Sequence, residues 1–186
     1  MQEREGFFQI YLREYILRNS VIENDSYYMN LGSMAIDNDY LFNTLLQIGE
    51  DPSLPWKAKF HILKMTQYRS CYRGDKGLSE VPLLISIATQ GEADEKTRDF
   101  CVRYLFEHLA MSQVSQCYLN IAQCKTNPFE LRIHCLRDLN SHPESHSIDR
   151  STLIMIAQDL LNSANPEDLD WKWEREYKPY LLKLLE

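Results

Sequence analysis

Glycine and proline are scarce in this chain, with six and seven copies among 186 residues. A turn-rich all-β fold uses many more of both, so this class is disfavoured. The sequence also has no uncharged apolar run of about 18 residues, and a membrane-spanning helix is therefore not expected. Acidic residues precede the first apolar stretch, which Arg13 and Glu14 interrupt. A secretory signal peptide has the opposite pattern, so none is predicted.

The common catalytic and nucleotide-binding motifs are absent from the sequence. It contains no Gly-x-Ser-x-Gly, no Gly-x4-Gly-Lys-Ser/Thr and no Gly-x-Gly-x-x-Gly. We therefore expect a protein that is not an enzyme and needs no cofactor. Cys117, Cys124, His142 and His146 suggest a zinc site, but six residues separate the cysteines, where two to four are usual. We expect no metal there, and zinc stays the alternative interpretation.

The five cysteines give an odd number scattered through apolar stretches. A disulfide framework favours an even count in a smaller chain. Reduced thiols packed as small apolar side chains are the simpler interpretation. We therefore expect an intracellular protein of the reducing cytoplasm.

Apolar residues recur at helical spacing along almost the whole chain, and no alternating strand pattern is present. The sequence predicts an all-α fold, with a first helix over residues 3–22 and an irregular connection over residues 23–36. The next helix begins at Asp37 or Asp39 and ends before Gly49, a residue suited to a left-handed C-terminal position.

Two Asn-Pro pairs mark later helix starts. Asn127 followed by Glu130 is typical of a capping box, in which each side chain bonds the other residue's backbone N–H. Asn165 and Pro166 repeat the pattern, and Pro179 is expected to bend or break the last helix.

A gapless internal repeat connects four of the predicted helices. The repeated segments begin at Pro55, Asp94, Pro128 and Pro166, which lie 39, 34 and 38 residues apart. The fifth position holds Lys59, Arg98, Arg132 and Asp170, the eighth Ile62, Cys101, Cys135 and Trp173, and the tenth Lys64, Arg103, Arg137 and Arg175. Each repeated helix follows another predicted helix, so the unit is a helix pair.

This period and the second-helix pattern, as in Leu131-Arg132 followed by Cys135-Leu136, resemble HEAT or armadillo repeats. The resemblance covers residues 37–178. It implies a right-handed α-solenoid of about four HEAT-like helix pairs, within a single domain over residues 1–186. Residues 1–36 would add an N-terminal helix and connection, and residues 179–186 a C-terminal amphipathic cap. The alternative is an irregular helical bundle with helices of similar length.

Charge is divided unevenly along the chain. The segment from Leu54 to Arg73 contains five lysines or arginines and no acid, whereas the remainder carries 15 bases against 27 acids. The formal net charge of −7 disfavours nucleic acid or an anionic membrane as a partner. It does not disfavour one localised acidic ligand.

In a solenoid the second helix of each pair lines the concave face. The predicted partner-binding residues on those helices are Lys57, His61, Lys64, Arg98, Arg103, Arg132 and Arg137. They suggest a non-catalytic adaptor or scaffold that binds an acidic or phosphorylated protein segment. The structural alternative is that these bases pair with acids of adjacent repeats.

Two other functions remain open from the sequence. A family of alkylpurine DNA glycosylases is built from HEAT-like repeats, and Asp99 or Asp138 beside arginines would then be the catalytic candidate. The other is a helical-bundle subunit that forms homo-oligomers through its C-terminal helix, which carries Trp171, Trp173 and Tyr177.

Overall fold

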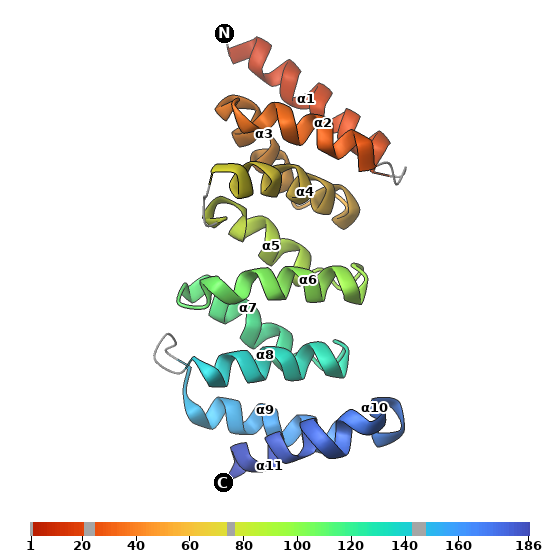
Figure 1. Ribbon diagram of the computed structural model, residues 1–186, viewed down its shortest axis with the longest axis vertical. Helices are drawn as coiled ribbons and strands as arrows, with labels where there is room; N and C mark the ends of the chain where they lie inside the picture. The colour runs from red at the N-terminus through yellow and green to blue at the C-terminus, as the bar shows by residue number, and fades with distance from the viewer. Residues whose placement is uncertain (1, 21–24, 74–76, 143–147) are drawn as a thin grey trace. The chain divides into compact units, whose positions relative to one another are not determined.

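The computed structural model describes residues 2–20, 25–73, 77–142 and 148–186. Across these ranges the protein is helical and contains no strand, so the predicted all-α class is confirmed (Figure 1). The α-helices are α1 (Gln2–Asn19), α2 (Asp25–Ile36), α3 (Asp39–Gly49), α4 (Trp56–Arg73), α5 (Val81–Ala88), α6 (Glu95–Leu105), α7 (Ser112–Gln123), α8 (Phe129–Ser141), α9 (Arg150–Ser163), α10 (Pro166–Lys172) and α11 (Lys178–Leu185).

The described ranges also contain three shorter helical stretches. Two are 3₁₀ turns, η1 (Leu78–Glu80) and η2 (Phe106–His108), and the third, η4 (Trp173–Tyr177), is π-helical. None of the helices in the described ranges is both long enough and apolar enough to cross a membrane.

The chain forms two compact units, Met1–Cys101 and Val102–Glu186. The boundary falls inside α6, between Cys101 and Val102. Each unit is described by itself below, and the single domain expected over residues 1–186 stays a prediction.

In the first unit α4 is the central helix. It contacts α1, α2, α3 and α5, so helices that follow one another in the chain pack together. Ile62, Leu63 and Met65 of α4 are completely buried, together with Ile16 of α1 and Ala35 of α2. The apolar side of α4 therefore lies at the centre of this core.

The irregular connection predicted over residues 23–36 is wrong, because Asp25–Ile36 forms α2. Gly32 and Ser33 in this segment are poor helix formers, which favoured a loop on local propensity alone. Extensive contact with α4 stabilises the helix instead, since packing supplies most helical stability in proteins.

Gly49 does not adopt the predicted left-handed position. It is the last residue of α3, and the C-cap residue Glu50 is right-handed, at φ −75°. A Cβ added to Gly49 would lie 3.0 Å from Leu83 Cδ1 and 3.4 Å from Ile62 Cγ2. Glycine is needed there because α3 approaches these side chains closely.

In the second unit α7 contacts α8, α8 contacts α9, and α9 contacts α11. The core formed by these helices includes Tyr118, Ile133, Cys135, Leu136, Leu139, Leu160 and Leu181. The hydroxyl of the completely buried Tyr118 donates a hydrogen bond to the carbonyl of Val102. The polar end of this buried ring is thereby satisfied.

The capping box predicted at Asn127 and Glu130 is not formed. The backbone N–H of Asn127 donates to the Cys124 carbonyl over 3.0 Å, and Glu130 Oε1 instead accepts from Lys172 Nζ over 2.9 Å. Glu130 Oε1 therefore bonds Lys172, and the Asn127 N–H bonds Cys124. A capping box would join these two groups to each other.

The predicted disturbance near Pro179 is present. Pro179 lies in the first turn of α11, directly after the π-helical stretch η4. Proline has no N–H to donate to the preceding turn, and a π-helical stretch accommodates such a gap. Leu181 and Leu184 beyond it are buried where α11 packs against α9.

Candidate partner-binding surface

The seven predicted binding residues come from three helices and from both units. Lys57, His61 and Lys64 lie on α4, and Arg98 lies in the part of α6 that belongs to the first unit. The others, Arg103, Arg132 and Arg137, belong to the second unit.

Arg98 and Arg132 do not face solvent, with exposed fractions of 4% and 3%. Arg98 Nε donates to the carbonyl of Ala88 over 3.0 Å, and Arg132 Nε donates to the carbonyl of Ala122 over the same distance. Each carbonyl lies ten residues before its arginine, in the last turn of the preceding helix. Carbonyls there have no partner within their own helix. Both arginines therefore cap a helix C-terminus, and their assignment to a partner-binding face is wrong.

Arg132 also pairs with an acid of the same chain, which was the alternative to partner binding for these bases. Its Nη2 lies 2.7 Å from Asp159 Oδ2, and Lys125 Nζ lies 2.6 Å from the other carboxylate oxygen. Hydrogen bonds from Lys125 and then Arg132 hold the pKa of Asp159 below its ordinary value. This acid therefore stays ionised and compensates the buried guanidinium.

The side chain of Lys59 on α4 also points into the protein. Only 3% of it is exposed, and its Nζ donates to Ser86 Oγ over 2.7 Å. Burial lowers the pKa of Lys59, with a smaller opposing effect from the charge of Asp51. Arg69 is also used internally, because it lies 4.1 Å above the Phe42 ring and donates to Asp39 over 2.5 Å. Two of the five bases from Leu54 to Arg73 thus hold neighbouring helices.

His61 is buried as well, with 8% of it exposed, so a partner has little access to its side chain. Lys57 and Lys64 remain exposed on α4. Each lies over an aromatic ring, with Lys57 Nζ 5.7 Å from the Trp56 centroid and Lys64 Nζ 5.0 Å from the Phe60 centroid. These four residues, Trp56, Lys57, Phe60 and Lys64, are the α4 surface.

The geometry of the α4 surface is fixed by packing beneath it. The Phe60 ring meets Phe100 of α6 edge-on, with centroids 5.6 Å apart. Lys57 and Lys64 are seven residues apart, so they lie about 10 Å apart along the helix axis. The ring quadrupoles hold the ammonium groups near half-buried aromatic faces. This arrangement presents two separated positive charges on an apolar support.

Arg103 and Arg137 are exposed in the second unit. They and two histidines surround Asp138, whose pKa is raised by burial despite the opposing charges of His134, His142, Arg137 and Arg103. Arg137 also lies 5.7 Å from the Tyr180 centroid and 4.0 Å from Glu176. Two acids, Asp138 and Glu176, therefore lie close to these arginines.

Within the described residues, no group of three or more His, Cys, Asp or Glu side chains has metal-binding geometry. Cys117 is buried, and the exposed Cys124 has its Sγ 3.1 Å from Thr126 Oγ1. His146, the last member of the alternative zinc set, lies outside the described residues.

The aromatic half of the α4 surface was missed by the sequence interpretation. Phe60 lies four residues before Lys64, and this spacing places side chains on one helix face. Trp56 is the residue directly before Lys57. Aromatic residues beside lysines within an acid-free segment were the available signal.

The chain matches no family model, no curated protein and no solved structure in these comparisons.

Proposed function

We propose that this protein is a non-catalytic adaptor or scaffold that binds an acidic or phosphorylated protein segment through the α4 surface. The observation that carries the proposal is that some basic side chains of α4 point inward and others point toward solvent. Lys59 and Arg69 are used inside the first unit, whereas Lys57 and Lys64 point outward on aromatic supports. No acid occurs in the sequence from Leu54 to Arg73.

The spacing of the two lysines defines what such a segment should look like. A polyproline II peptide rises about 3.1 Å per residue and has three residues per turn, so residues i and i+3 share a face about 9 Å apart. Acidic or phosphorylated residues at i and i+3 would therefore match Lys57 and Lys64. Phosphate groups would form charge-assisted hydrogen bonds with both ammonium groups.

The proposal includes a HEAT-like α-solenoid in the cytoplasm. Sequential helix pairs and the repeated contact of Arg98 with Ala88 and of Arg132 with Ala122, 34 residues later, support the repeat. None of Cys101, Cys117, Cys124 and Cys135 is in a disulfide, which supports a reducing compartment.

The test is a fluorescence anisotropy titration with a labelled peptide that carries two phosphoserines at i and i+3 in a proline-rich background. Lys57→Glu with Lys64→Glu should weaken binding at least about tenfold, because two attractive charges become repulsive. The matched control is Arg18→Glu with Arg175→Glu, which changes net charge equally at exposed residues of α1 and η4.

We expect the control to bind within about twofold of the wild type at 150 mM salt, where bulk charge effects are screened. Both doubles should keep the helical circular dichroism spectrum. Equal losses in the two doubles, or unchanged binding by the α4 double, would contradict the proposal. A peptide with the phosphoserines adjacent should bind more weakly than the i, i+3 peptide.

The two other functions are separated by simple experiments. A DNA-binding or glycosylase-type protein should shift duplex DNA in a gel at low salt, with Asp99 or Asp138 as the residue to replace. Oligomerisation through the C-terminal helix should appear in size-exclusion chromatography and be lost on truncation after Pro179. Trp173 and Tyr177 are buried within the second unit, so most of that helix's aromatic area is already used internally.

A further inference from the structure

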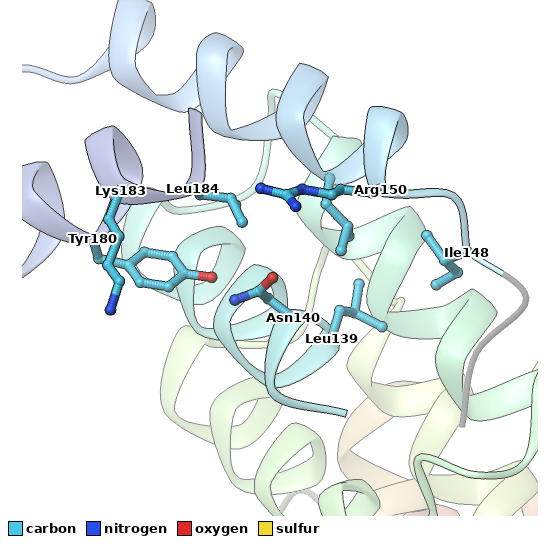
Figure 2. A pocket seen from close by; sticks show the side chains of 8 residues that line it. Leu139, Asn140, Ile148, Arg150, Tyr180, Lys183 and Leu184 are labelled. Carbon is cyan, nitrogen blue, oxygen red and sulfur yellow. The ribbon is translucent and has the colours of Figure 1, made fainter. Parts of the chain in front are cut away.

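A pocket of about 450 Å³ lies among α8, α9 and α11, entirely within the second unit (Figure 2). Its lining residues are Leu139, Asn140, Ile148, Arg150, Leu153, Tyr180, Lys183 and Leu184. The volume falls in the range of small-molecule sites, about 300 to 1,000 Å³. Nothing in the α4 surface depends on this pocket.

The pocket has an apolar part and a polar part. Leu139, Leu153 and Leu184 are buried and supply the apolar part. Arg150 and Lys183 supply the polar part, and both side chains are exposed to solvent. Figure 2 shows the hydroxyl of Tyr180 directed toward the Asn140 amide, and the guanidinium end of Arg150 extending toward the side of Leu184. A ligand with an apolar body and a polar head would match both parts.

The polar part has an excess of positive charge. Among the described residues, neither Arg150 nor Lys183 forms an ion pair or a side-chain hydrogen bond, although Asp149 is adjacent to Arg150 in sequence and bonds Ser151. The half-buried Asp138 is close enough to Tyr180 to affect its pKa slightly, and Arg137 lies over the same ring. An anion is therefore the complementary head group.

Tyr180 adds a neutral hydrogen-bonding group to this charge. Burial raises the pKa of Tyr180 to about 12, against smaller opposing effects that include Arg137 and a hydrogen bond with Asn140. The hydroxyl donates to the Leu136 carbonyl over 3.4 Å, which leaves its oxygen as an acceptor and holds the ring in place. The ring and the Asn140 amide thus form a fixed wall beside the cations.

We infer that this pocket binds a small amphipathic carboxylate, with its head at Arg150 and its apolar body against Leu139, Leu153 and Leu184. The planar fork of a guanidinium matches the two oxygens of a carboxylate. A monoanion is favoured over a dianionic phosphate because each further charge beside buried leucines adds a desolvation cost.

The test uses octanoate as the probe and the full chain. Backbone amide shifts in ¹H–¹⁵N NMR spectra report both the site and the affinity. Octanoate should give saturable shifts centred on Asn140, Leu153 and Leu184. Octanol lacks the charge and acetate lacks the apolar body, so each should bind at least about tenfold more weakly.

Arg150→Gln should weaken octanoate binding about tenfold, which corresponds to loss of a charge-assisted pair. The matched control is Arg175→Gln, because Arg175 is exposed in the same unit and does not line the pocket. It should bind within about twofold of the wild type. Ile148→Phe narrows the apolar part without changing charge, and it should weaken octanoate while leaving the already weak acetate signal unchanged.

Several outcomes would overturn the inference. One is the absence of saturable shifts at the pocket up to about 10 mM octanoate, well above a millimolar dissociation constant. Another is equal binding of octanol and octanoate, or equal loss in the Arg150 and Arg175 variants. Tighter binding of octyl phosphate than of octanoate would overturn the assignment to a carboxylate.

Discussion

Arg98 and Arg132 each place a permanent positive charge against the C-terminal carbonyls of the preceding helix. The C-terminal end of a helix carries a partial negative charge, so a buried guanidinium there is favourably placed. Arginine suits this position because its Nε can hold a carbonyl while its Nη atoms reach another group. Arg132 uses both, contacting Ala122 and Asp159.

Replacing Arg132 by Met should lower the free energy of unfolding by about 2–4 kcal/mol, because the Ala122 carbonyl loses its donor and Asp159 loses one of its two cations. Urea unfolding followed by circular dichroism measures the change. Arg175→Met at an exposed position is the control and should cost no more than about 0.5 kcal/mol. A similar small cost for both variants would show that Arg132 has no capping role.

The sequence grouped Arg98 and Arg132 with the binding residues because position in a repeat does not distinguish a groove from a helix junction. Both arginines share the fifth position with Lys59, which also turns inward. All three side chains bond groups within the protein, so their role is structural. Lys64, Arg103 and Arg137 at the tenth position are all exposed.

The start of α3 was predicted closely, at Asp37 or Asp39 against the observed Asp39. Asn38 Oδ1 accepts from the Leu41 N–H at the start of α3, and Asp149 accepts from the Ser151 N–H at the start of α9. Such caps act within one turn, so sequence alone reveals them. The helix α2 was missed because its stability comes from α4, which is more than twenty residues away in sequence.

The α4 surface was only partly predictable for the same reason. Helical spacing places Lys57, His61 and Lys64 within one face. The histidine is buried while both lysines are exposed, so neighbouring helices cover only the edge of that face. Periodicity gives the direction of a side chain, whereas tertiary contacts decide whether it reaches solvent.

Gly49→Ala should destabilise the protein by up to about 2 kcal/mol, because overpacking against Leu83 costs about 1–3 kcal/mol and the gain in helix propensity offsets about 1 kcal/mol of it. The matched control is Gly6→Ala in α1, where an added Cβ meets no atom within 4 Å. That variant gains propensity without a clash and should be neutral or slightly more stable. Thermal unfolding of both variants measures the difference; equal stabilisation would show that Leu83 yields easily.

At the scale of the whole molecule, acids outnumber bases, yet several carboxylates are strongly engaged. Among the described residues, a hydrogen bond is the largest influence on the pKa of four carboxyl groups, and it lowers the pKa of each. In order of residue number, these are Asp51 with Ser53, Glu130 with Lys172, Asp149 with Ser151, and Asp159 with Lys125 and then Arg132. The distribution spans both units, so acid sensitivity is a property of the whole chain rather than of one site.

A carboxyl group whose pKa is lower in the folded state binds fewer protons there than in the unfolded state at intermediate pH. Its stabilising contribution is complete above the unfolded pKa and is lost as the pH falls through the folded pKa. The free energy of unfolding should therefore decline from about pH 5 downward, as four such groups become protonated. Asp138, whose pKa is raised by burial, acts in the opposite direction and offsets part of the decline.

Asp159→Asn combined with Glu130→Gln isolates this effect. The double variant should be less stable than the wild type at pH 7, and the difference should shrink toward pH 3 because the wild-type carboxylates are then protonated too. Urea unfolding at several pH values measures both curves. Glu167→Gln, at an exposed residue without a described side-chain hydrogen bond, should run parallel to the wild type. A double variant that also stays parallel would mean that the ion pairs with Lys125, Arg132 and Lys172 do not cause the acid sensitivity.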